Sequence, residues 1–293
     1  MSILEVQHLN KHFKTFSLQD ITIQLEKGCI MGFIGENGSG KTTTIKLLLN
    51  GLPKDSGEIK LFGLDHIVNE VAVKEKLGYV PADDYFTDSA TLASHAKALK
   101  PFYKTWDEDF FQTIVETWNL PQSQKMHEFS KGMKTKAMLA LALAHRPQLL
   151  ILDEPTVGLD PSARLEVLDI LREFVADGER SVFLSTHITT DLDKIADYIT
   201  LIHQGTIRES LSIDHLQEKY ALVEGNLSQL QTHKEIFIGI RKGDIRFEGL
   251  LLRENALKYF NSEQIKVPNI ENLLTLLTYG IQNENNNPIL KGL

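Results

Sequence analysis

The sequence predicts an α/β fold in which helices flank a largely parallel sheet. Three observations lead to this fold class. Strand-like apolar runs alternate with helical segments through residues 1–215, a glycine-rich loop connects the buried run 29–34 to a helical segment, and residues 84–145 change to a helical period. We therefore expect a mixed sheet with a parallel core, an antiparallel N-terminal strand layer, and a helical subdomain inserted at about residues 84–145.

The individual elements follow from short apolar runs, alternation and breaker residues. Residues 21–25 alternate apolar with polar side chains, and Gly51 and Pro53 end the helical segment that follows the glycine-rich loop. The expected strands span residues 3–6, 21–25, 29–34, 57–62, 77–80, 149–152, 181–185 and 198–203. The expected helices span residues 42–49, 92–99, 110–118, 135–144, 163–175 and 191–197.

The pattern changes beyond about residue 215. Residues 236–240 and 245–251 flank a polar turn at 241–244 and predict a hairpin, residues 269–280 predict a short amphipathic helix, and the tail at 283–287 is polar. We therefore divide the chain into a first domain over residues 1–215 and a small α+β accessory domain over residues 216–293.

Composition excludes several classes of function. Apolar residues make up 42% of the chain and charged residues 24%, an ordinary globular mixture, while a net charge of −8 argues against binding along a nucleic-acid backbone. The single cysteine, Cys29, allows no disulfide within the chain, which fits a reducing compartment. The longest apolar runs, at 137–144 and 149–152, are far shorter than the roughly 20 residues that cross a bilayer. The N-terminus does not resemble a signal peptide.

Residues 35–42 read GENGSGKT, the spacing of a phosphate-binding P-loop, and they lie between a predicted strand and a predicted helix as that motif requires. Glycines let successive backbone N–H groups point at one phosphate, and the helix N-terminus adds a positive end. Lys41 can neutralise the β- and γ-phosphates, and the Thr42 hydroxyl can bind Mg²⁺. The loop therefore predicts a nucleoside triphosphate site.

Residues 149–154 read LLILDE, a buried strand that ends in two carboxylates. Asp153 is placed to hold the Mg²⁺ shell, and Glu154 to orient or deprotonate an attacking water. Many strands end in acidic residues, so this pattern is weak alone. Downstream of a P-loop it predicts hydrolysis of the nucleotide.

Three further strings carry a resemblance to a known family. Residues 129–134 read FSKGMK, residues 153–161 read DEPTVGLDP, and residues 185–187 read STH. In order and position they resemble the signature motif, the Walker B motif with D-loop, and the switch histidine of ATP-binding-cassette (ABC) ATPases. The resemblance covers residues 1 to about 215. The form SKGM is most similar to cassettes that serve bacterial exporters of drugs, antibiotics and peptides.

The resemblance implies an ATP-hydrolysing subunit with a P-loop NTPase cassette fold. It implies ATP and Mg²⁺ as ligands, a second identical or related cassette as partner, and integral membrane subunits on separate chains. It places the chain in the cytoplasm, peripheral on the inner face of the membrane. ATP closes the pair of cassettes in this family, and hydrolysis reopens it.

The resemblance also implies roles for single residues. Glu154 activates water and His187 contacts the γ-phosphate, while Phe13 stacks on adenine, with Phe16 as the alternative. Ser130 and Gly132 contact the γ-phosphate bound by the partner, and Asp160 couples the two sites. The implied metal ligands are Thr42 and Asp153. The implied nucleotide-binding residues are Phe13, Gly35, Glu36, Asn37, Gly38, Ser39, Gly40, Lys41, Thr42, Thr43, Ser130, Gly132 and Asp160.

One position departs from the family pattern. The family usually has Gln or Glu where this chain has Ala82, in the string GYVPA at residues 78–82. An alanine side chain neither binds Mg²⁺ nor holds a water, so hydrolysis could be slow or depend on partner chains. We hypothesise that Asp83 takes the metal-proximal role.

Four alternatives stay open at this point. A cassette ATPase acting on nucleic acid or ribosomes is opposed by the acidic charge and by the absence of long heptad arms. A P-loop GTPase or a small-molecule kinase needs neither SKG nor STH. A regulatory subunit with weak turnover is opposed by Glu154 and His187 and favoured by Ala82.

Overall fold

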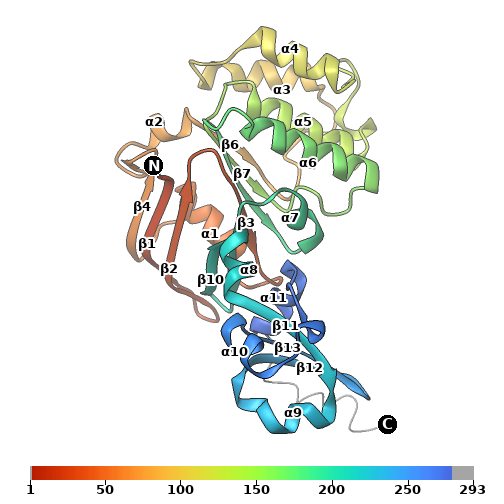
Figure 1. Ribbon diagram of the computed structural model, residues 1–293. Coiled ribbons are helices and arrows are strands. Elements are labelled where there is room, and N and C mark those ends of the chain that lie inside the picture. Colours follow the sequence, from red (N-terminus) through yellow and green to blue (C-terminus); the bar gives the residue numbers. More distant parts are fainter. Residues whose placement is uncertain (1, 279–293) are drawn as a thin grey trace.

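The computed structural model describes residues 2–278 as three sheets with their helices (Figure 1). The first sheet is antiparallel, with strand order β2-β1-β4-β5. Its strands are β1 (Ser2–His12), β2 (Ser17–Glu26), β4 (Ser56–Leu61) and β5 (Leu64–Asp65). The side chains of β2 largely alternate between buried and exposed positions, as expected for a strand with one face on the core. This sheet is the expected N-terminal strand layer.

The second sheet is the mixed central sheet, with strand order β10-β9-β3-β8-β7-β6. The pairs from β9 to β6 are parallel, and β10 joins the edge antiparallel to β9. Every residue of β3, β7 and β8 is buried, which explains their continuous apolar runs. The strands are β3 (Ile30–Ile34), β6 (Leu77–Val80), β7 (Leu149–Asp153), β8 (Ser181–Thr186), β9 (Tyr198–His203) and β10 (Thr206–Ser212).

Helices α3, α4 and α5 gather at one end of the molecule, as the predicted helical insertion requires (Figure 1). The side chains of Thr91, Asp107 and Ser130 cap their first turns by accepting backbone N–H bonds. The helices of this region and of the central sheet are α1 (Lys41–Leu48), α2 (Glu70–Lys74), α3 (Leu92–Leu99), α4 (Glu108–Thr117), α5 (Lys131–Leu143), α6 (Pro161–Val175) and α7 (Thr189–Ile195), with 3₁₀ turns at Lys100–Phe102 and Met126–Glu128.

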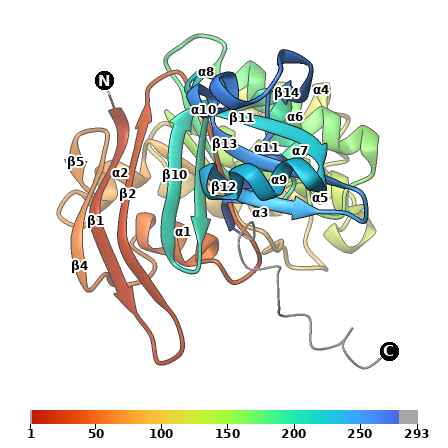
Figure 2. The same cartoon turned by 60° about the horizontal axis from the view of Figure 1, so that its bottom comes forward.

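The third sheet belongs to the C-terminal elements, which Figure 2 turns toward the viewer. It is antiparallel, with strand order β12-β13-β11-β14. These elements are α8 (Ile213–Lys219), β11 (Tyr220–Asn226), α9 (Leu227–His233), β12 (Phe237–Lys242), β13 (Arg246–Leu252), α10 (Arg253–Tyr259), β14 (Ile265–Lys266) and α11 (Ile270–Thr278), with 3₁₀ turns at Lys234–Ile236 and Ser262–Gln264.

The expected hairpin is confirmed by the antiparallel pairing of β12 with β13. The helix expected at 269–280 is present as α11, and residues 279–280 and the polar tail 283–287 lie outside the described residues. The first two strands are longer than expected because polar residues continue their ladders. Within residues 2–278, none of the helices combines the length and apolar character needed to cross a bilayer.

Candidate functional site

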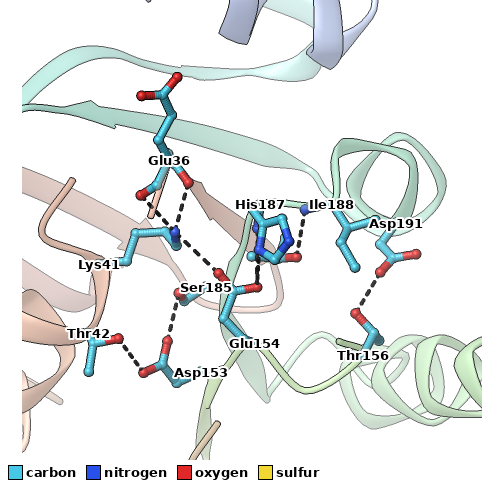
Figure 3. Close-up of polar contacts among 12 residues, drawn as sticks. Glu36, Lys41, Thr42, Asp153, Glu154, Thr156, Ser185, His187, Ile188 and Asp191 are labelled. Carbon is cyan, nitrogen blue, oxygen red and sulfur yellow. Dashed lines mark hydrogen bonds and ion pairs between the residues drawn. The ribbon is translucent and has the colours of Figure 1, made fainter. Parts of the chain in front are cut away.

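The candidate site lies at the carboxyl ends of three adjacent strands. Strand β8 pairs with β3 on one side and β7 on the other, all parallel, so the residues that follow each strand meet at one edge of the sheet. The loop of residues 35–40 follows β3, Asp153 and Glu154 end β7 or follow it, and His187 follows β8. Figure 3 shows Lys41, Asp153, Glu154 and His187 converging there.

The glycine-rich loop is held in a shape that only glycine adopts easily. Gly40 has a φ of +116°, and a Cβ at this position would lie 2.5 Å from the Leu18 side chain. The Lys41 ammonium folds back over the loop and donates to the carbonyl oxygens of Gly35 (2.7 Å) and Glu36 (3.1 Å). The Ser39 hydroxyl is buried in the loop and has no hydrogen-bond partner within residues 2–278. The loop therefore offers a buried polar atom and a positive charge to a ligand.

Asp153 is almost fully buried, at 1% exposure, and its two oxygens accept from residues of different elements, helix α1 and strand β8. The Thr42 hydroxyl donates to Oδ2 at 2.8 Å, and the Ser185 hydroxyl donates to Oδ1 at 2.9 Å. Burial, together with the charge of Asp153, raises the pKa of the neighbouring Tyr79 to about 12, so this phenol stays neutral. A buried carboxylate beside a hydroxyl is an oxygen-ligand set of the kind Mg²⁺ prefers.

Glu154 stands between a cation and a histidine. One carboxylate oxygen, Oε1, lies 3.2 Å from the Lys41 ammonium, and the other, Oε2, lies 2.9 Å from Nδ1 of His187. Its backbone has a φ of +50°, which a residue with a side chain adopts at a cost of roughly 1–3 kcal/mol. A hydrogen bond from its N–H to the Ser185 carbonyl (2.9 Å) supports that turn. The strained backbone aims the carboxylate at the edge where the loop ends.

The residues present fit a nucleoside triphosphate with a divalent cation. The orphaned Ser39 hydroxyl, the Lys41 ammonium and the start of α1 surround one point, and these are donors for phosphate oxygens. Thr42 and Asp153 supply oxygen ligands beside that point. Among the expected loop residues, Asn37 and Gly38 are exposed at the tip, while Glu36 and Thr43 are half-buried.

Phe13 lies just after β1, with 43% of its surface exposed, and its ring stacks on Phe16 with 6.4 Å between ring centroids. Phe16 packs closer to the loop, because a Cβ at Gly40 would lie 3.0 Å from its ring. Part of the Phe13 ring is therefore accessible to a planar ligand, with the Lys11 ammonium 5.8 Å from the ring centroid, while Phe16 supports the loop.

The serine and glycine of the FSKGMK string begin α5. Ser130 is exposed and accepts a hydrogen bond from the Met133 N–H (3.2 Å), while Gly132 is buried where a Cβ would lie 2.9 Å from Ala163 of α6. Asp160 caps α6 by accepting from the N–H groups of Ser162 and Ala163, both at 3.0 Å. Within residues 2–278, no hydrogen bond or ion pair joins Ser130 or Gly132 to the loop of residues 35–43.

The segment after β6 carries the departure at Ala82. Ala82 and Asp83 are both exposed. Asp84 instead pairs with Lys134 of α5, with 3.1 Å between its Oδ2 and the ammonium. Asp84 is thereby paired with the last residue of the signature string, which leaves Asp83 as the nearby carboxylate for the metal-proximal hypothesis.

Sequence reasoning missed two parts of this region. Ser185 was recognised only as part of a motif, although its hydroxyl binds Asp153 directly. Asp191 on α7, at 1% exposure, pairs with Arg164 of α6 (2.5 Å) and accepts from the Thr156 hydroxyl (2.7 Å). The sequence shows only that an acidic residue, Asp191, lies four positions after His187 at the start of the helix expected at 191–197.

Comparisons with known proteins show the family of this chain. Residues 18–157 match the family described as ABC transporter. The chain is 30% identical over 228 residues to the ABC transporter ATP-binding protein YtrB of Bacillus subtilis, with 78% of this chain and 76% of YtrB aligned. It is 31% identical over 205 residues to the bacitracin transport ATP-binding protein BcrA of Bacillus licheniformis, covering 69% of this chain and 67% of BcrA.

A solved structure described as the ATP-binding subunit of an ABC transporter superposes with a TM-score of 0.67, at 27% identity, over 73% of this chain and 92% of the other. The P-loop NTPase fold with its mixed sheet is thereby confirmed, and the GTPase and kinase alternatives are excluded. The chain belongs to the ATP-binding proteins of ABC transporters: it is an ATPase and the ATP-binding subunit of such a transporter.

Proposed function

We propose that this chain powers an exporter of antibiotics, drugs or peptides whose pore is formed by separate membrane subunits. The SKGM form of residues 130–133 supports export by its resemblance to exporter cassettes, and the relative BcrA is described as a bacitracin transport protein. The net charge of −8 argues against a role on nucleic acid. In this role the chain works in the cytoplasm, held on the inner face of the membrane by those subunits.

Residues 35–43 bind the triphosphate in this proposal. Lys41 moves its ammonium from the loop carbonyls to the β- and γ-phosphates, and the buried Ser39 hydroxyl gains a phosphate partner. Phe13 stacks on adenine through its exposed face. Thr42 and Asp153 hold Mg²⁺, which when bound neutralises part of the phosphate charge.

The position of the Glu154 carboxylate, between Lys41 and His187, is the observation that carries the catalytic assignment. Glu154 accepts the proton of the attacking water, because its carboxylate stands beside the place where Lys41 holds the terminal phosphate. His187 orients Glu154 by donating from Nδ1 and donates to the γ-phosphate from its other ring nitrogen, because phosphate oxygens accept hydrogen bonds and the ring is 41% exposed.

A second cassette, identical or related, completes each site. Exposed Ser130 and the start of α5 contact the γ-phosphate bound by that partner, with Gly132 allowing the close approach of α5 to α6. Asp160, at the start of α6, couples the two sites. Because one ATP contacts both cassettes only in the closed pair, binding closes the pair and hydrolysis reopens it. Residues 1–215 form the ATPase domain in this scheme, and residues 216–293 an accessory domain.

Transport into inside-out membrane vesicles tests the direction of transport. Vesicles from the source cell that carry the wild-type chain and its membrane subunits should accumulate labelled bacitracin when ATP is added outside. Vesicles with Glu154→Gln should accumulate none above the level without ATP. ATP-dependent accumulation that is equal in the two vesicle types would overturn the assignment of Glu154. Release of preloaded peptide on addition of ATP would overturn export.

A further inference from the structure

Helix α7 lies between the candidate site and the C-terminal unit, by which we mean α8 to α11 (residues 213–278). It begins at Thr189, two residues after His187. The N–H of the intervening Ile188 donates to the Thr186 hydroxyl at 3.0 Å, so the short connection is held to the end of β8. A displacement of α7 therefore acts directly on the position of His187.

One side of α7 is bound to the segments that follow β7. Buried Asp191 pairs with Arg164 of α6. Asp191 also accepts from the hydroxyl of Thr156, two residues after Glu154 (Figure 3). Arg164 also donates to the Thr190 hydroxyl at 3.0 Å. Helix α7 therefore contacts the segment after Glu154 through Thr156, and it contacts α6, whose first turn Asp160 caps, through Arg164.

The other side of α7 receives the C-terminal unit. Asp193 Oδ1 accepts from the N–H of Ile270, the first residue of α11, at 3.3 Å. Asp193 as a whole residue is exposed, and the partial burial of its carboxylate raises its pKa. The buried side chains Leu273 and Leu276 of α11 share an apolar cluster with Leu192 and Ile195 of α7.

The C-terminal unit is also held at its first residue, by a hydrogen bond to the segment that follows α7. The Asp197 carbonyl accepts from the N–H of Ile213, the first residue of α8, at 2.9 Å, and its carboxylate accepts from the N–H of Ile30 at the start of β3. A cavity of about 230 Å³ remains in this joint, lined by Asp193, Ala196, Leu216, Asn269 and Leu273 among others. Incomplete packing leaves room for α11 to shift against α7.

From these contacts we infer that the C-terminal unit sets the rate of ATP hydrolysis by positioning α7, and with it His187. Asp193 and Leu273 are the positioning residues of this joint, one through a hydrogen bond and one through packing. The inference rests on the proposed function, because it needs His187 to act at the phosphate. When the joint loosens, His187 spends less time in place, which lowers turnover without removing the loop that binds ATP.

Steady-state ATP hydrolysis by the full-length chain tests the joint. Asp193→Ala removes the acceptor for Ile270, and Leu273→Ala removes packing between α11 and α7. Each should lower kcat by at least about fivefold, the lower end of coupling between distinct sites, with KM for ATP unchanged. Asp193→Asn keeps an oxygen acceptor and should retain the wild-type kcat.

Leu230→Ala is the matched control, because Leu230 is buried in a separate cluster within the C-terminal unit that contains no residue of α7. It should lower the melting temperature as Leu273→Ala does and leave kcat unchanged. Two results would overturn the inference: wild-type kcat in both joint variants, or an equal loss of kcat in Leu230→Ala. The proposed function survives either result, since it fails instead when the wild type drives no ATP-dependent transport.

Discussion

His187 contacts Glu154 twice, through its backbone N–H at 3.2 Å and through ring Nδ1 at 2.9 Å, both to the same carboxylate oxygen Oε2. An ionised carboxylate only accepts hydrogen bonds, so His187 donates to Glu154 from both its backbone N–H and its ring Nδ1. The other carboxylate oxygen faces Lys41. We therefore expect substitution of Glu154 or His187 to lower the rate of ATP hydrolysis more than the affinity for ATP.

Replacing Glu154 by glutamine should abolish turnover while ATP remains bound. Glutamine keeps the shape of the side chain but accepts no proton, and loss of a general base lowers the rate by about 100-fold or more. Phosphate release and equilibrium ATP binding, measured on the same preparation, separate the two effects. Turnover within a few-fold of wild type would remove Glu154 as the base.

Lys41→Ala should weaken ATP binding itself. The ammonium is the buried cation of the loop, at 6% exposure, and a charge-assisted hydrogen bond of this kind changes a dissociation constant by about tenfold or more. Lys46→Ala is the matched control, because Lys46 lies exposed on the same helix. Equal ATP affinity in the two variants, by titration calorimetry, would contradict the assignment.

Asp153→Asn should raise the Mg²⁺ concentration needed for half-maximal hydrolysis. The substitution removes the negative charge that faces Thr42 while leaving an oxygen in place. Thr42→Ser keeps the hydroxyl and should leave the Mg²⁺ requirement close to wild type. A Mg²⁺ titration of ATPase activity distinguishes the two, and an unchanged requirement in Asp153→Asn would rule out its role as a ligand.

Asp83→Ala should reduce Mg²⁺-dependent turnover if Asp83 replaces the side chain that Ala82 lacks. Asp84→Ala is the comparison, because Asp84 is already paired with Lys134. A Mg²⁺ titration of both variants checks the assignment. Unchanged turnover in Asp83→Ala, or an equal loss in Asp84→Ala, would refute it.

Stability should fall in mild acid because of His145. This ring is 1% exposed, it stacks on Tyr103, and burial lowers its pKa from 6.5 to about 4. As pH falls below 6.5 the unfolded chain takes up a proton that the folded chain refuses until about pH 4, so folding is penalised between these values. The loss approaches about 3 kcal/mol at the acid end.

Urea unfolding at a series of pH values measures this loss. His145→Gln has no titrating ring and should show a shallower decrease in the free energy of unfolding over the same range. Identical pH slopes for wild type and variant would show that other groups control acid stability.

Much of the fold was accessible from the sequence, because buried parallel strands read as continuous apolar runs. Residues 149–153 and 181–186 are buried throughout and were placed almost to the residue. Strand β10 was missed, because its side chains are half-buried or exposed and their pattern is mixed. The start of α5 was placed late, at residue 135, because apolar periodicity does not detect the capping role of Ser130 at the true start of the helix.

The candidate site was predictable where its residues are adjacent in sequence to a strand end. Asp153 ends β7, Glu154 and His187 directly follow β7 and β8, and Lys41 and Thr42 follow the loop after β3, so the parallel sheet brings them together. The contact between Asp193 and Ile270 was not predictable, because it joins residues 77 positions apart through one backbone N–H. Tertiary contacts of this kind leave no pattern in a single sequence.

The central claim is that the loop of residues 35–40, before α1, binds the triphosphate of ATP. Equilibrium dialysis with labelled ATP, Mg²⁺ and any companion subunits tests it most directly. The wild-type chain should retain ATP with a dissociation constant below about 1 mM, within the range usual for enzyme substrates. Lys41→Ala should retain much less at the same concentration. No retention of ATP by the wild-type chain at millimolar concentration would contradict the account.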